Sequence, residues 1–189
     1  MRIGVFGGSF DPVHNAHLIV ARLAAEQLQL DRVVFTVAAS QPLKRGRHAA
    51  TAEQRLRMVA LAVAGIPDFL ADGRELHRPP PSYTIDTVRE LAAENPGAEL
   101  VLIMGADVAS RLDQWRDPDA IRSLATIAVC HRNELSDPSS QLLAGFVVPA
   151  MAISSTAIRS RAATGKSLAG WVPPSVADYI VASQIYVEL

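Results

Sequence analysis

The sequence predicts a single α/β domain over residues 1–189, built on a doubly wound parallel sheet. Short apolar runs rich in β-branched residues alternate along the chain with longer stretches of helical periodicity. The first apolar run ends in two glycines, which is typical of a strand-to-helix turn. Apolar residues make up 49% of the chain, enough for a sizeable core, and the sequence contains no linker or internal repeat that would divide it.

The opening residues predict a βαβ unit. Residues 2–6, RIGVF, form a short apolar run that indicates a buried parallel strand. Residues 15–30 place apolar side chains at helical spacing, and Asn15 is a candidate N-cap because its short side chain can accept from unpaired N–H groups. Residues 32–38, RVVFTVA, indicate a second strand, so the crossover between the two strands should be right-handed.

The alternation continues to the C-terminus. Further helices are expected over residues 51–65, 84–97, 117–125, 155–164 and 174–183, and further strands over residues 99–105, 126–132 and 146–150. Thr51 and Gln54 form a capping pair at the start of one of these helices. Residues 40–50 and 75–83 show no regular pattern and precede helices, so they are either ordinary surface loops or the border of a site.

Composition restricts the partners and the compartment. The net charge of -1 and the aromatic content of 5% do not favour nucleic acid or a membrane as a partner. The single cysteine, Cys130, excludes an internal disulfide framework and fits a reducing compartment. No apolar run approaches the ~20 residues that cross a bilayer, and the first is too short for a signal peptide. We therefore expect a cytoplasmic protein, and the sequence leaves open whether it forms a homo-oligomer.

The turn after the first strand has the composition of an anion site. Residues 7–17 read GGSFDPVHNAH, with Gly7 and Gly8 where a doubly wound sheet binds ligands, at the end of a strand. Glycine admits a ligand close to the backbone, and the start of a helix favours phosphate, although two glycines can also serve only to turn the chain. Neither the P-loop pattern nor the dinucleotide pattern G-x-G-x-x-G is present.

Two histidines follow this turn. His14 and His17 are three residues apart, so they share one face of the first helical turn. A zinc site needs further ligands, and the other histidines lack metal-ligand spacing, so we predict no metal ligands here. The pair is better suited to donating hydrogen bonds to phosphate oxygens, since phosphoryl and nucleotidyl transfer depends on positioning and charge stabilisation. A purely structural role in capping or packing is the alternative.

Two motifs together resemble one superfamily. Gly8, Phe10, Pro12, His14 and His17 match G-x-F-x-P-x-[HT]-x-x-H, and residues 153–161, ISSTAIRSR, are similar to I-S-S-T-x-I-R. Both belong to the nucleotidyltransferase α/β-phosphodiesterase superfamily. The resemblance implies a Rossmann-like nucleotidyltransferase fold for the whole domain.

Three further stretches resemble the bacterial nicotinate mononucleotide adenylyltransferase family. They are residues 80–88, PPSYTIDTV, residues 105–115, GADVASRLDQW, and residues 171–180, WVPPSVADYI. The chain departs from the family at Pro80 and Ala16, where glycine is usual, and at Gly170 and Trp171, where a bulkier pair is usual. The alternatives are phosphopantetheine adenylyltransferase, which usually has threonine at position 14, and a non-catalytic nucleotide-binding regulator.

The resemblance implies transfer of AMP from ATP to nicotinate mononucleotide, with Mg²⁺ bound mainly through the ATP phosphates. It implies His14, His17 and Arg159 as catalytic residues, with Arg161 adding charge. The implied ATP-binding residues are Gly7, Gly8, Ser9, Phe10, His14, His17, Gly105, Asp107, Ile153, Ser154, Ser155, Thr156 and Arg159. The implied mononucleotide-binding residues are Ser40, Lys44, Arg45, Tyr83, Thr84 and Trp115.

Several of these residues also have a plain structural interpretation. Asp107 is implied to accept from ribose hydroxyls, but it could be a solvated residue at a helix start. Trp115 is implied to stack on the pyridine ring, but it could be a packed core residue. Lys44 and Arg45 are implied to guide phosphate, but they could be a solvated charged run.

Overall fold

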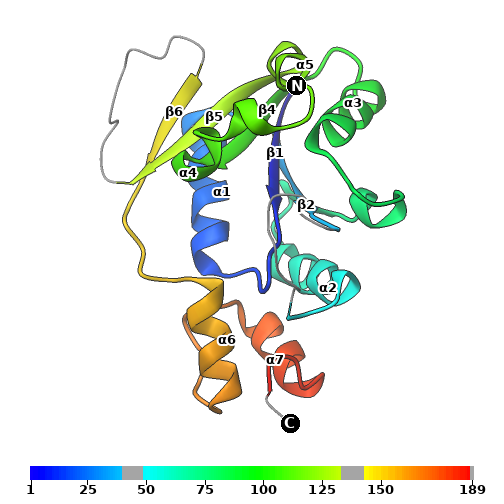
Figure 1. Cartoon of the computed structure of the whole chain (residues 1–189). Coiled ribbons are helices and arrows are strands. Elements are labelled where there is room, and N and C mark those ends of the chain that lie inside the picture. The colour runs from blue at the N-terminus through cyan, green and yellow to red at the C-terminus, as the bar shows by residue number, and fades with distance from the viewer. Residues whose placement is uncertain (40–48, 133–142, 188–189) are drawn as a thin grey trace.

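The computed structural model describes residues 1–39, 49–132 and 143–187 (Figure 1). The described strands are β1 (Arg2–Gly8), β2 (Arg32–Val37), β3 (Phe69–Asp72), β4 (Glu99–Gly105), β5 (Ala125–Arg132) and β6 (Leu143–Val148). The α-helices are α1 (Asn15–Gln27), α2 (Ala52–Val63), α3 (Thr84–Glu94), α4 (Ala106–Ala109), α5 (Pro118–Leu124), α6 (Ser155–Ala163) and α7 (Pro174–Ala182). Two 3₁₀ turns are η1 (Arg74–His77) and η2 (Leu112–Gln114).

The strands form one parallel sheet in the order β3-β2-β1-β4-β5-β6. The order reverses between β1 and β4, which lie side by side with Phe6 opposite Ile103. In a doubly wound sheet, ligands bind beyond the carboxyl ends of the strands at this reversal. The sequence-based prediction of a doubly wound parallel sheet is confirmed, and the fold places the 9–14 turn at the reversal.

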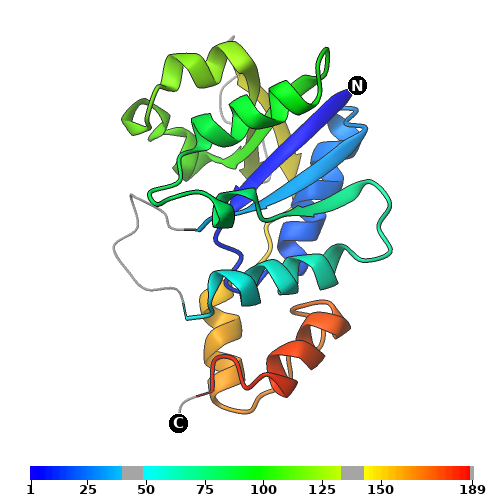
Figure 2. The same ribbon diagram turned by 90° about the vertical axis from the view of Figure 1, so that its right-hand side faces the viewer.

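Two hydrophobic cores lie on the two faces of the sheet (Figures 1 and 2). The first core contains side chains of α1, α2, α6 and α7, and the second contains side chains of α3 and α5. Along β4, Val101 and Ile103 belong to the first core, whereas Leu100, Leu102 and Met104 belong to the second. This alternation is expected because successive side chains of a strand point to opposite faces.

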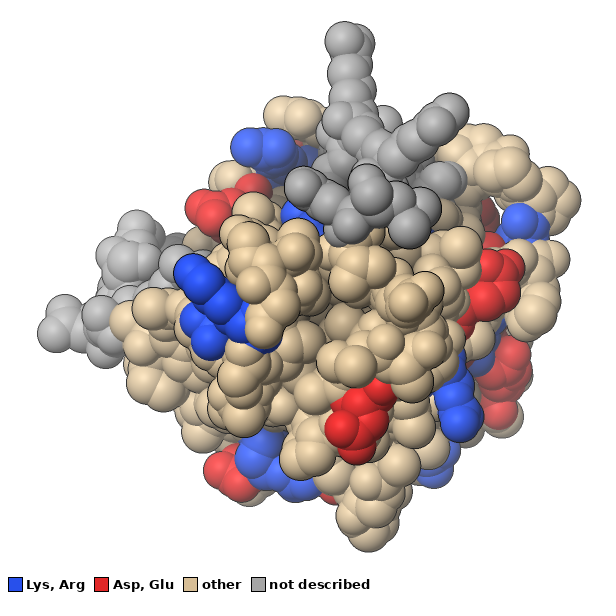
Figure 3. All heavy atoms as spheres, turned by 90° about the horizontal axis from the view of Figure 1, so that it is seen from below, with Lys and Arg blue, Asp and Glu red and all other residues tan. Residues whose placement is uncertain are grey.

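The C-terminal helices α6 and α7 lie together beyond the carboxyl end of β1, next to the turn that leads into α1 (Figures 1 and 2). The Ser175 hydroxyl donates to the carbonyl of Leu61 at 3.1 Å and so fastens α7 to α2. Seen from this end, the surface carries separate basic and acidic groups among mostly uncharged atoms, not one charged patch (Figure 3). No helix within the described residues is long and apolar enough to cross a membrane.

Several local predictions are confirmed and some differ. The Thr51–Gln54 capping box is present: the Gln54 N–H donates to Thr51 Oγ1 at 3.2 Å, and the Thr51 N–H donates to Gln54 Oε1 at 2.9 Å. Helix α1 has His14 as its N-cap, one position before the expected Asn15. The Asn15 side chain instead donates to the carbonyl of Gly170 at 2.9 Å, so it ties the helix to the C-terminal region. The short elements β3 and α4 have no counterpart in the prediction.

Candidate active site

The turn between β1 and α1 folds back on an aromatic side chain. Phe10 has φ 48° and its side chain is 3% exposed, with its ring 5.7 Å from the Phe35 ring and 5.1 Å from the His17 ring. A Cβ at Gly8 would lie 2.9 Å from the Phe10 ring, so packing alone requires glycine there. The Phe10 side chain therefore supports the turn from inside.

The two histidines form a stacked pair at the start of α1. Their ring centroids are 3.6 Å apart and the rings are inclined by 19°. The backbone N–H of His14 donates to Nδ1 of His17 at 3.2 Å. Because this Nδ1 accepts a hydrogen bond, the neutral His17 ring carries its proton on Nε2. That N–H is a fixed donor at the carboxyl end of β1.

Burial keeps both imidazoles uncharged near neutral pH. Burial lowers the pKa of His14 to about 4, against a small opposing effect of its own backbone. Burial and the neighbouring His14 together lower the pKa of His17 well below its usual value. The Ser9 hydroxyl is also buried, and it has no hydrogen-bond partner among the described residues. Neutral donors and an unpaired hydroxyl therefore meet at the turn, where a phosphate could satisfy them.

Helix α6 is fastened to this turn from across the sequence. The Ser155 hydroxyl donates to the carbonyl of Pro12 at 2.9 Å, and Arg159 Nη1 donates to the carbonyl of Asp11 at 2.7 Å. Ser154 is the N-cap of α6, as expected, and its side chain accepts from the N–H of Ala157 at 3.2 Å. The structure thus brings the two motifs together although more than 140 positions separate Pro12 from Ser155.

Other residues of the second motif have different surroundings. Thr156 Oγ1 accepts from Arg159 Nη2 at 3.3 Å, and Ile153 packs against the first core. The Arg161 guanidinium donates to the carbonyl of Ser167 at 2.9 and 2.8 Å and lies 4.8 Å from the Trp171 ring centroid. Arg161 therefore holds the connection between α6 and α7, whereas Arg159 holds the turn.

Two other residues that the resemblance implies for ATP lie at the end of the neighbouring strand β4. Gly105 is the N-cap of the short helix α4, and Asp107 lies exposed in its first turn. Because β4 pairs with β1, these two residues lie at the same edge of the sheet as the histidine turn. Their carboxylate and backbone groups are open to solvent at the predicted ligand site.

Three of the residues implied for the mononucleotide, Tyr83, Thr84 and Trp115, lie on the second face of the sheet. Tyr83 is the N-cap of α3, Thr84 follows it, and Trp115 follows η2. Tyr83 and Trp115 are half-buried and pack against the same core, and the Arg116 guanidinium lies 4.7 Å from the Tyr83 ring centroid. The structure brings these side chains to one region. Ser40, Lys44 and Arg45 lie outside the described residues.

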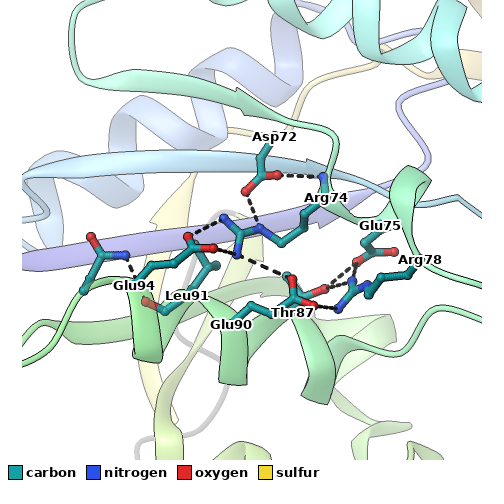
Figure 4. Close-up of polar contacts among 9 residues, drawn as sticks. Asp72, Arg74, Glu75, Arg78, Thr87, Glu90, Leu91 and Glu94 are labelled. Atoms are coloured by element: carbon teal, nitrogen blue, oxygen red, sulfur yellow. Dashed lines mark hydrogen bonds and ion pairs between the residues drawn. The ribbon is translucent and has the colours of Figure 1, made fainter.

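An ion-pair network braces the segment before Tyr83 (Figure 4). The Arg74 guanidinium reaches Asp72 at 2.6 Å and Glu94 at 2.9 Å, so it joins β3 to α3. The Thr87 hydroxyl donates at 3.0 Å to Glu75, a buried residue whose pKa is raised by burial. The Arg74 ion pair therefore holds the last turn of α3, whereas the Thr87–Glu75 hydrogen bond holds the helix near its start, where Tyr83 and Thr84 lie.

Two residues that the sequence did not indicate also support the turn. Arg55 is 1% exposed and its Nη1 donates to the carbonyl of Ser9 at 2.7 Å. The Tyr186 hydroxyl donates to Oδ1 of Asp11 at 2.7 Å. An arginine on the apolar face of the helix over residues 51–65 was a usable signal, whereas nothing local marks Tyr186 as a neighbour of the turn.

No group of three or more His, Cys, Asp or Glu side chains is arranged to hold a metal ion within residues 1–39, 49–132 and 143–187. A metal that arrives on a phosphate ligand is nevertheless compatible with the turn, since such ions take most of their ligands from phosphate and water.

Comparisons with known proteins identify the family of the chain. Residues 5–161 match a family model described as cytidylyltransferase-like. A Thermus thermophilus protein named "Probable nicotinate-nucleotide adenylyltransferase" is 43% identical over 98% of this chain and 100% of its own length. A Gemmatimonas aurantiaca protein of the same name is 38% identical over 100% of this chain and 93% of its own.

A solved structure shares the fold. Plasmodium falciparum nicotinic acid mononucleotide adenylyltransferase complexed with NaAD has a TM-score of 0.79 to this chain and 16% sequence identity. The match covers 98% of this chain and 97% of the other. This likeness confirms the expected Rossmann-like nucleotidyltransferase fold.

Proposed function

The chain belongs to the cytidylyltransferase-like family, and from that premise we propose which of its residues carry out the reaction. It is a nicotinate-nucleotide adenylyltransferase of NAD biosynthesis, which transfers AMP from ATP to nicotinate mononucleotide. The products are nicotinate adenine dinucleotide and pyrophosphate. The observation that carries the assignment of residues is the stacked, uncharged His14–His17 pair at the carboxyl end of β1.

The chemistry requires positioning more than a protein nucleophile. A phosphate oxygen of the mononucleotide forms a bond to the α-phosphorus of ATP, and the bond from that phosphorus to the bridging oxygen of pyrophosphate breaks. His17 would donate from Nε2 to an oxygen on the transferring phosphorus, with His14 beside it. Fixed donors in a site that excludes water stabilise the charge that develops on these oxygens.

The ATP side of the site continues into α6 and α4. Arg159 uses two of its five N–H donors on Asp11 and Thr156, and the others are proposed to bind the triphosphate. Asp107 would accept hydrogen bonds from the ribose hydroxyls. Further ATP contacts are assigned to the backbone or hydroxyls of Gly7, Gly8, Ser9, Phe10, Gly105, Ile153, Ser154, Ser155 and Thr156.

The proposed mononucleotide side of the site is formed by residues that lie beside the second core. Trp115 would stack on the pyridine ring, and Tyr83 and Thr84 would border it, because Tyr83 and Trp115 pack against the same core and Thr84 follows Tyr83. Ser40, Lys44 and Arg45 are kept as proposed phosphate contacts, although they lie outside the described residues.

Mg²⁺ is proposed to enter with ATP, as part of the substrate. Phosphate oxygens and water would supply most of its ligands, and it would neutralise charge on the departing pyrophosphate. The cytoplasm is the proposed compartment, because a chain with one cysteine suits a reducing environment.

Pyrophosphate release tests the function directly. The protein is supplied with ATP and Mg²⁺ and with one of three acceptors: nicotinate mononucleotide, nicotinamide mononucleotide or phosphopantetheine. We expect rapid release with nicotinate mononucleotide. Release with phosphopantetheine alone would overturn the roles given to Tyr83, Thr84 and Trp115. ATP binding without release in any mixture would overturn the enzymatic function itself.

A further inference from the structure

A hydrogen bond joins the C-terminal segment to the turn after β1. The Tyr186 hydroxyl donates to Oδ1 of Asp11 at 2.7 Å, across 175 positions of sequence. Asp11 is 6% exposed, so its carboxylate has little contact with water and bonds mainly to protein groups. Burial raises the pKa of Tyr186, and the nearby Asp11 carboxylate raises it further, so the hydroxyl stays protonated and acts as a donor.

The same carboxylate holds a third segment. Its Oδ2 accepts from the N–H of Ala49 at 2.8 Å, and its Oδ1 accepts from the N–H of Ala50 at 3.1 Å. These two residues lead into Thr51, the N-cap of α2. The Asp11 carboxylate therefore joins the turn, the entry to α2 and the C-terminal segment.

The backbone of Asp11 and Pro12 anchors two residues of the proposed ATP side. Its carbonyl accepts from Arg159 at 2.7 Å, and the next carbonyl, of Pro12, accepts from Ser155 at 2.9 Å. His14 follows only three positions after Asp11. A shift of the Asp11 backbone, which its carboxylate contacts hold in place, would move the anchor of Arg159 and the start of α1 together, because they share one short stretch of chain.

The C-terminal segment adopts an unfavourable backbone conformation to make this contact. Gln184 has φ 50° and Tyr186 has φ 68°, in the left-handed region that bulky residues rarely occupy. Ile185 between them is 4% exposed and packs in the first core. Such backbone strain persists only where the surroundings fix it, and it often accompanies a functional contact.

We propose that Tyr186 is a positioning residue for adenylyl transfer, which acts by holding the Asp11 carboxylate and thereby the turn backbone that anchors Arg159 and leads into His14. This inference rests on the proposed function. It assigns no contact with substrate to Tyr186, and it predicts an effect on the rate of the chemical step.

The first test compares two variants that each remove one hydroxyl. Tyr186→Phe keeps the ring and loses the donor, whereas Tyr179→Phe makes the same change at a tyrosine of α7 that packs against the same core. Steady-state kinetics are measured well below the unfolding temperature, with circular dichroism as a check on folding. We expect kcat to fall about fivefold to tenfold in Tyr186→Phe, with both KM values within about twofold of the parent protein.

The parent protein and the control variant test the proposed function, whereas Tyr186→Phe tests the positioning role. Full adenylyltransferase activity in the parent protein and in Tyr179→Phe keeps the function, whatever Tyr186→Phe does. A folded Tyr186→Phe protein whose kcat stays within about twofold of the parent overturns the positioning role. A merely structural hydrogen bond would lower the unfolding temperature without changing kcat in the folded protein.

Asp11→Asn provides a second test from the other partner. If Tyr186 acts through Asp11, this variant lowers kcat as well, and Tyr186→Phe adds less than about twofold to it. An undiminished effect of Tyr186→Phe in the Asp11→Asn background would show that the hydroxyl acts elsewhere, and would overturn the proposed route. Tyr186→Phe alone decides whether the hydroxyl affects the rate, because Asp11→Asn also changes the contacts with Ala49 and Ala50.

Discussion

The His14 and His17 rings lie face to face with their centroids 3.6 Å apart, and the backbone N–H of His14 donates a hydrogen bond to Nδ1 of His17. This arrangement gives His17 a defined tautomer before any ligand binds. It also means that the pair acts as neutral donors, since two stacked imidazolium ions in a buried site would repel each other. The first predictions concern this pair.

Replacing His17 with alanine should remove most of the turnover while the protein still folds. The variant loses the Nε2 donor that we place against the transferring phosphorus, and loss of one such donor typically costs about 10²-fold to 10³-fold in kcat. Steady-state pyrophosphate release measures the loss, and circular dichroism checks the fold. His77→Ala, at an exposed histidine of η1, is the control and should keep the parent rate. A folded His17→Ala protein with the full rate would refute the phosphate role.

Stability should fall as the pH drops from about 6.5 to about 4, in part because of His14. In this window an unfolded His14 binds a proton, whereas the folded one, with a pKa of about 4, does not. The unfolded state therefore gains protons first, and the free energy of unfolding decreases as pH falls. His14 alone should make the free energy of unfolding on the order of 3 kcal/mol larger above pH 6.5 than below pH 4.

Urea unfolding at several pH values tests this prediction against His14→Gln, which lacks the titrating group. Carboxylates also titrate in this range and affect both proteins. The difference between the two slopes of unfolding free energy against pH therefore reports the effect of His14. The parent protein should lose more stability than His14→Gln between pH 6.5 and 4. Parallel curves would mean that the His14 ring titrates in the folded protein as it does in water.

The sequence predicted the parts of the fold that depend on local pattern. The Thr51–Gln54 capping box follows from residue types three positions apart, and β1 and β4 follow from apolar runs that end in glycine. The four-residue strand β3 was missed because it is too short to show a period. His14 was missed as N-cap because imidazole is not a preferred capping side chain.

Long-range contacts at the site were less predictable. The second motif named Ser155 and Arg159 through a resemblance, and the structure adds that both bind carbonyls of the turn. The contact between Asp11 and Tyr186 has no local signature, because its partners are 175 positions apart and only folding brings them together. Residue types can indicate a phosphate site, but they do not show which buried side chains hold its backbone in place.

Arg55→Met should destabilise the protein and slow the reaction. The Arg55 guanidinium is buried and donates to the carbonyl of Ser9, so methionine would fill similar space and leave that carbonyl without its donor. An unsatisfied buried acceptor costs about 1–3 kcal/mol, and the Ser9 end of the turn would lose its anchor. Arg57→Met, on the exposed face of the same helix, is the matched control. Equal unfolding free energies for the two variants would contradict the anchoring role.

Trp115→Ala should raise the KM for nicotinate mononucleotide much more than the KM for ATP. The Trp115 ring is half-buried, so part of it packs against the second core and part remains available to stack on a pyridine ring. Loss of one stacked ring contact typically costs about 1–3 kcal/mol, which corresponds to a rise of about fivefold to 150-fold in the mononucleotide KM. Trp115→Phe keeps an aromatic face and should recover most of this loss. If alanine raised both KM values equally, or if phenylalanine gave no recovery while the protein stayed folded, Trp115 would be a core residue and the pyridine ring would have to bind elsewhere.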